Sequence, residues 1–204
     1  MKNNPLTPIN SLNFLNMKAI NFSKMNFIKT SFIALSGLLL LSCSEDNDSP
    51  EMVNEEEVIT SVVVTLNNGG NTVTLSSVDL DGDGPNPPVV SVDNLKANTT
   101  YTGAVSFLNE AESPIEDITE EVLEEADEHQ VFYEFSGAIT AATATDSDSN
   151  GNPIGVAFTL TTGDAGTAVV GFTLRHEPKK PNSGLLDAGG ETDVAVSFNV
   201  SVTD

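Results

Sequence analysis

The sequence predicts an all-β fold, an antiparallel β-sandwich of about nine strands with one short inserted helix. Many short segments rich in β-branched residues alternate apolar and polar side chains, which is typical of strands with one buried face. Clusters of Gly, Asn, Asp and Pro separate these segments, as turns between strands require. The repeated strand-helix-strand order of a parallel sheet does not occur, so we expect two packed antiparallel sheets.

The first expected strands form a hairpin, because residues 58–66 and 72–80 are β-patterned and the turn cluster at residues 67–71 separates them. Residues 81–88 are rich in Gly and Pro and predict an irregular loop, since proline cannot donate to a strand ladder. The other expected strands are residues 89–92, 101–108, 131–135, 139–145, 156–162, 168–174 and 193–202.

The segment from Leu95 to Tyr101 resembles the Leu-x-Pro-x-Thr-x-Tyr corner of fibronectin type III domains, with Ala97 in place of the proline. This resemblance implies that the Tyr101 hydroxyl bonds back to the chain upstream and that a strand begins there. The corner comes earlier in the domain than in that family, so only the local corner is carried over; the fold expected from the strand pattern is an immunoglobulin-like sandwich. The strand after it should point Val105 and Phe107 inward.

The inserted helix is expected over residues 118–128, with Asp117 as its N-cap. Its apolar residues, Ile118, Val122, Leu123 and Ala126, recur at helical spacing. This apolar stripe should cover one end or edge of the sheets.

The sequence before the β-patterned region reads as an export leader. Residues 31–41 form an apolar run that is long enough for a signal peptide and too short to span a bilayer. The segment from Leu40 to Cys43 resembles the lipobox of bacterial lipoproteins, which implies lipidation of Cys43 and a membrane anchor. We expect a signal peptide over residues 1–42, with the true start at Met25 or, as the alternative, at Met17. A lipidated cysteine and acidic tether over 43–57 and a β-sandwich domain over 58–204 should follow.

Charge is distributed unevenly along the chain. From Cys43 onward there are four basic and 30 acidic side chains, a formal net charge of −26. Nucleic-acid binding and binding to anionic headgroups are therefore not expected, because both need Lys and Arg. With a single cysteine the chain cannot form an internal disulfide.

Two histidines with acidic neighbours form one candidate metal site. Imidazole and carboxylate groups together can bind zinc, so His129, His176, Glu125 and Glu177 are candidate ligands. On the expected helix, Glu125 and His129 would share a face at i, i+4 spacing. The alternative is two unrelated surface histidines, with His129 stabilised by the C-terminal end of the helix dipole.

Two loops match the first half of a calcium-binding loop, in which alternate oxygen ligands converge on one ion. Neither has the glutamate at position twelve, and Asp, Asn and Gly are also ordinary turn residues. The candidate calcium ligands are Asp79, Asp81 and Asp83 in the first loop and Asp146, Asp148 and Asn150 in the second.

No nucleophile-elbow, zinc-protease or phosphate-loop motif occurs in the sequence, so we do not expect an enzyme.

The lipobox and the segments at residues 117–121, 125–130, 175–178 and 189–193 resemble an uncharacterised family of Bacteroidota outer-membrane lipoproteins. Acidic residues directly after Cys43 resemble the surface-export signal of such lipoproteins; the alternative is a plain solvated spacer. The resemblance brings no established activity with it. We expect a non-enzymatic binding or accessory protein of the outer membrane, with an outer-membrane receptor as its partner. The alternative function is binding of a divalent metal, zinc or calcium.

Overall fold

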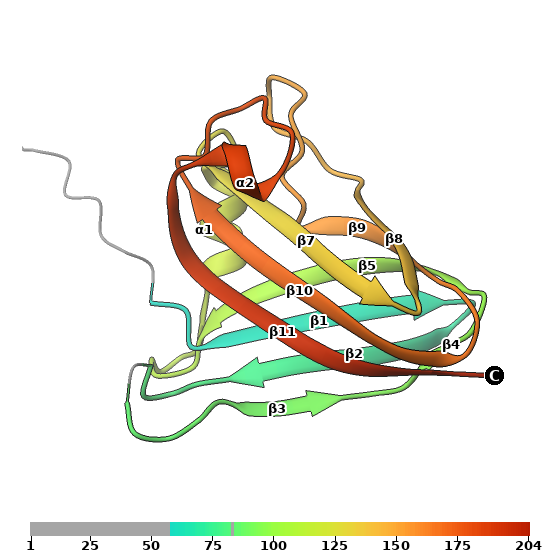
Figure 1. Cartoon of the computed structure of the whole chain (residues 1–204). Coiled ribbons are helices and arrows are strands. Elements are labelled where there is room, and N and C mark those ends of the chain that lie inside the picture. The colour runs from blue at the N-terminus through green and yellow to red at the C-terminus, as the bar shows by residue number, and fades with distance from the viewer. Residues whose placement is uncertain (1–57, 83) are drawn as a thin grey trace, which may run out of the picture. The chain divides into compact units, whose positions relative to one another are not determined.

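The computed structural model describes residues 58–82 and 84–204, which all belong to the compact unit Pro50–Asp204. It confirms the all-β sandwich: two sheets pack face to face, with β7, β10 and β11 in front of β1, β2 and β5 in Figure 1. The leader, Cys43 and the tether lie outside the described residues.

The larger sheet has the strand order β3-β2-β1-β5-β9-β8, and β6 pairs with β5 at one end. The expected hairpin is confirmed, because β1 and β2 pair antiparallel from Ser61 opposite Val78 to Asn68 opposite Asn71. The strands are β1 (Ser61–Asn68), β2 (Asn71–Val78), β3 (Val89–Val92), β5 (Thr100–Asn109), β6 (Glu116–Asp117), β8 (Ile139–Ala144) and β9 (Ala157–Thr162).

The smaller sheet has the order β4-β11-β10-β7. Its pairings are antiparallel except for β4 and β11, which run parallel, so the expectation of a purely antiparallel fold is wrong at this edge. The strands are β4 (Leu95–Lys96), β7 (His129–Gly137), β10 (Gly166–His176) and β11 (Glu191–Thr203). Within the described residues, the nine expected strands all occur, and β4 and β6, of two residues each, are additional.

The core lies between the sheets, because alternate residues of each strand point inward. Val105 and Phe107 are buried as predicted, with 0 % and 1 % of their surface exposed. An aromatic chain links the layers: the ring centroids of Phe158 and Phe172 lie 5.5 Å apart, and those of Phe172 and Phe198 lie 6.3 Å apart. Burying each such ring contributes about 1.5–3 kcal/mol.

The tyrosine corner is confirmed in its geometry. The hydroxyl of Tyr101 accepts a hydrogen bond of 2.7 Å from the backbone N–H of Lys96, five residues upstream. The Tyr101 side chain is buried, with 3 % exposed, so this bond holds the parallel edge segment β4 against the start of β5.

The helix α1 (Ile118–Glu124) begins as predicted, with the Asp117 carboxylate accepting from the N–H of Thr119 at 3.0 Å. Ile118 and Val122 face the core, whereas Leu123 is 46 % exposed. The helix ends four residues before the predicted end, because the chain turns at residues 125–128 and then enters β7. A second short helix, α2 (Leu185–Ala188), lies in the segment between β10 and β11, in addition to the one helix that the sequence predicted.

Candidate metal site

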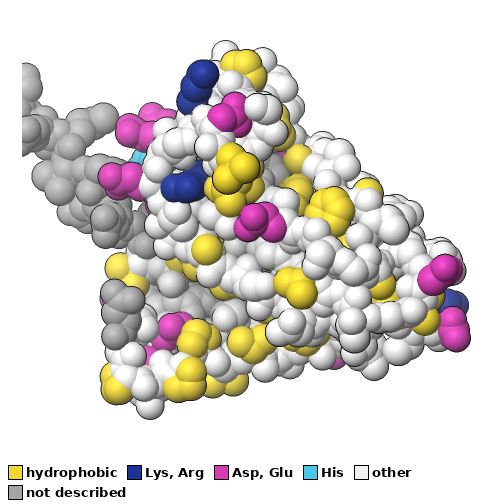
Figure 2. Space-filling model, in the orientation of Figure 1, with side chains coloured by type: hydrophobic (Ala, Val, Ile, Leu, Met, Phe, Trp, Pro, Cys, Tyr) yellow, Lys and Arg dark blue, Asp and Glu magenta, His cyan; other side chains and the backbone are white. Residues whose placement is uncertain are grey.

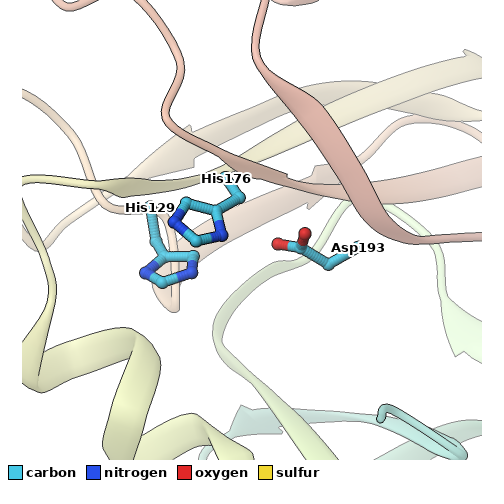
Figure 3. Close-up of side chains that lie close together, drawn as sticks. All are labelled: His129, His176 and Asp193. Atoms are coloured by element: carbon cyan, nitrogen blue, oxygen red, sulfur yellow. The ribbon is translucent and has the colours of Figure 1, made fainter. Parts of the chain in front are cut away.

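The two histidines lie side by side at one end of the smaller sheet. His129 is the first residue of β7 and His176 the last residue of β10, and the strand register places them directly opposite each other. Their ring centroids are 4.7 Å apart, with 35° between the ring planes (Figure 3). Residues 47 positions apart in the sequence therefore form one imidazole pair.

Both rings face the interior of the sandwich. On β10 the alternate residues Val170, Phe172, Leu174 and His176 are all buried, and His176 occupies the last of these inward positions. His129 is 0 % exposed and His176 is 8 % exposed. The apolar core thus ends in two groups that can bind a metal ion through a nitrogen lone pair.

Asp193 is the third member of this cluster. One ligand atom from each of His129, His176 and Asp193 lies within 4.8 Å of the other two. Figure 3 shows the Asp193 carboxylate facing a ring nitrogen of His176. The three residues come from β7, β10 and β11, which are neighbours in the sheet.

A bulge in β11 accounts for the position of Asp193. Opposite β11, Leu174 is paired with Val194 but the next residue, Arg175, is paired with Thr192, so Asp193 is the extra residue in the ladder. A bulge bends the strand and changes the direction of a side chain. In this way a residue beside the inward-facing Val194 also reaches the histidines.

Two hydrogen-bond contacts hold His129, one at its ring and one at its backbone. The ring Nδ1 of His129 lies 3.3 Å from the carbonyl oxygen of Glu125, and donation from Nδ1 to that carbonyl leaves the lone pair on Nε2. The carbonyl of His129 itself accepts a 2.6 Å hydrogen bond from Lys180 Nζ. The predicted helical face shared by Glu125 and His129 is wrong, because α1 ends at Glu124; Glu125 contributes its carbonyl, and its carboxylate is not among the converging ligand atoms.

A second set of possible ligands uses His176 from the outside. Ligand atoms of Glu128, His176 and Glu177 also lie within 4.8 Å of one another, and His176 Nε2 is 3.8 Å from Glu128 Oε2. Both glutamates are exposed. Three of the four residues predicted as zinc ligands therefore lie close together: His176 is near His129 in one set and near Glu177 in the other.

The second calcium-like loop is organised around an internal cation. The Asp148 carboxylate accepts from the backbone N–H groups of Asn150 and Asn152, at 2.9 and 2.8 Å, and lies 3.3 Å from Lys180 Nζ. Burial alone would raise the pKa of Asp148, but the hydrogen bonds from Asn152, Lys180 and Asn150 outweigh it and hold that pKa below its usual value. The ammonium of Lys180 thus supplies a positive charge beside Asp148, the residue that the sequence predicted as a calcium ligand.

The other oxygen ligands of this loop have separate partners. Asp146 accepts from the N–H groups of Gly155 and Ala157, both at 2.7 Å, and Asn150 donates to Asp127 at 3.3 Å. The carboxylates of Asp146 and Asp148 are thus occupied by hydrogen bonds from within the chain. Calcium binding by this loop stays a prediction.

The first calcium-like loop connects β2 to β3. The N–H of Asp79 donates to the Thr60 carbonyl, and the Asp81 carboxylate accepts from the Asn86 side chain at 2.6 Å. Asp83 lies outside the described residues, so calcium binding by this loop stays a prediction.

Comparison with protein families, with curated proteins and with solved structures finds no match to this chain. Within residues 58–82 and 84–204, no helix has the length and apolar character needed to cross a membrane. The site is therefore interpreted from its own chemistry.

Proposed function

We propose that this protein binds a divalent transition metal, with zinc as the best fit, through His129, His176 and Asp193. The observation that carries the proposal is the convergence of their ligand atoms within 4.8 Å on three neighbouring strands. Two imidazoles and one carboxylate are a ligand set that suits zinc, whereas calcium and magnesium prefer oxygen ligands alone.

The required movement is small. Zinc binds nitrogen and oxygen at about 2.0–2.2 Å, so two ligands of a tetrahedral ion are roughly 3.4 Å apart. The ligand atoms present lie within 4.8 Å of one another, and side-chain rotations that bring them closer by up to about 1.4 Å would complete three ligand positions. A fourth position would remain for water or for a group from a partner.

Zinc titration of the purified full chain by calorimetry tests the proposal. We expect one ion per chain, and more than about tenfold weaker binding in Asp193→Asn and His176→Ala. Glu125→Gln is the matched control, because the Glu125 carboxylate is outside the ligand cluster and should leave the affinity unchanged. Unchanged affinity in both ligand variants would show that the imidazole pair is only a packing contact.

We further propose that the protein acts as an exported, lipid-anchored binding protein of the outer membrane, without catalytic activity. The support is the lipobox-like segment ending at Cys43 and the apolar run before it. The bound metal would belong to nutrient uptake with a receptor protein, and a non-metal accessory role is the alternative if zinc does not bind. Mass spectrometry should find lipid on Cys43 and none in Cys43→Ser; an unmodified chain that retains Met1 would contradict the anchor.

A further inference from the structure

His176 belongs to two ligand sets that lie at different depths. The inner set is His129, His176 and Asp193, and the outer set is Glu128, His176 and Glu177. The inner set is largely closed to solvent, because His129 is 0 % exposed, whereas the side chain of Glu128 is 58 % exposed. Figure 2 shows a small patch of histidine surface between acidic side chains, and His176 is the histidine with exposed surface.

The backbone places the outer set. The N–H of Glu177 donates to the carbonyl of Glu128 at 2.7 Å, so the pairing of β7 and β10 continues one residue beyond the histidine pair. Glu177 has a φ of +48°, which is uncommon for a residue with a side chain. Gly190 packs against this turn so closely that a Cβ there would collide with the carbonyl oxygen of His176.

We propose that Glu128 and Glu177, together with His176, form an entry site, to which a zinc ion binds first before it passes to the inner set. This inference rests on the proposed zinc function and names the route to that site. A hydrated divalent cation must exchange its water for protein ligands, and exposed carboxylates can begin that exchange at the surface. His176 belongs to both sets, with Nε2 3.8 Å from the Glu128 carboxylate and the other ring nitrogen facing Asp193 (Figure 3). The ion therefore exchanges Nε2 and the glutamates for that second nitrogen, His129 and Asp193, with water as its ligand during the exchange.

This route predicts a kinetic signature. The outer glutamates are absent from the final ligand set, so removing their charge should raise the barrier between free and bound zinc without changing the end states. The association and dissociation rate constants should then fall by the same factor, and Kd should stay the same. Negative potential near a site also speeds cation association by about 10- to 1,000-fold, so a control for charge alone is needed.

Stopped-flow zinc binding to the full chain, followed with a competing chromogenic chelator, tests the route. For Glu128→Gln/Glu177→Gln we expect both rate constants to fall about tenfold or more, with Kd within about twofold of the original protein. The control Glu120→Gln/Glu124→Gln removes the same charge from exposed residues of α1 that belong to neither set, and should change the rates by less than about twofold.

Three outcomes would overturn the inference. If Glu128→Gln/Glu177→Gln binds and releases zinc with the rate constants of the original protein, the entry site is excluded. If the control Glu120→Gln/Glu124→Gln loses as much rate, the effect is one of general electrostatic attraction. A weaker Kd with an unchanged association rate would make the glutamates ligands of the final site. If the outer double variant does not fold, Glu128→Gln and Glu177→Gln are measured singly against the same criteria. Failure of the zinc function itself is recognised separately, because the original protein would then not bind zinc.

Discussion

Replacing Lys180 with methionine should destabilise the domain more than any change at an exposed lysine. The Lys180 ammonium donates to the carbonyls of Ala126 and His129 at 2.7 and 2.6 Å and lies 3.3 Å from the Asp148 carboxylate. The Lys180 side chain is 6 % exposed and that of Asp148 is 0 % exposed. One cation thus joins the turn after α1, the start of β7 and the loop at residues 146–153.

The magnitude follows from what the substitution leaves behind. Removing one partner of a buried ion pair costs about 3–5 kcal/mol, because the other charge loses its compensation. Asp148 keeps the N–H donors of Asn150 and Asn152, which places Lys180→Met at the lower end, about 3 kcal/mol. For a domain of this size the loss corresponds to a fall in Tm of about 10 °C.

Urea unfolding followed by circular dichroism measures this loss. Lys179→Met is the matched control, because Lys179 is the exposed neighbour and should lose less than about 0.5 kcal/mol. In the double variant Lys180→Met/Asp148→Asn the uncompensated charge is gone, so the two losses should fall short of additivity by about 1 kcal/mol or more. A Lys180→Met protein as stable as Lys179→Met would refute the claim that this cation organises the end of the sandwich.

Two further predictions concern named bonds. The pKa of Asp148 is lower in the folded protein than in the unfolded chain, so the unfolded chain takes up a proton at this carboxylate first as the pH falls. The stability that the carboxylate contributes is therefore present at neutral pH and is lost as the pH falls below the ordinary pKa of 3.8. The difference in Tm between the original protein and Asp148→Asn should narrow between pH 5 and pH 2.5, and a constant difference would contradict this prediction. Tyr101→Phe removes the 2.7 Å bond from Lys96 and should cost about 1 kcal/mol in urea unfolding, whereas no loss would mean that burial of the ring alone holds the corner.

The strands could be predicted because their signals are local. Alternation of buried and exposed residues in β10 and the turn between β1 and β2 both depend on neighbours in the sequence. The N-cap at Asp117 is local in the same sense. The end of α1 was not predictable from periodicity, because residues 125–128 contain good helix formers that the tertiary fold places in a turn before β7.

The role of Lys180 could not be read from the sequence, since its partners Ala126 and Asp148 lie 54 and 32 positions away and carry no pattern that names a lysine. Asp148 was singled out, but for calcium. Asp and Asn at alternate positions with a following glycine describe any loop that folds around a cation, and here the cation comes from the chain itself.

Asp193 shows why the third candidate ligand was missed while the two histidines were found. Simple alternation along residues 193–202 assigns Asp193 to the face opposite Val194, away from the core. The register shift between Leu174 and Arg175 breaks that alternation at one residue, and the interruption occurs at the end of β10 that carries His176. A bulge is a relation between two strands and has no signature in one strand alone. Histidines are recognisable by residue type, so the sequence could name them; the carboxylate that joins them depends on pairing, and only the sheet reveals it.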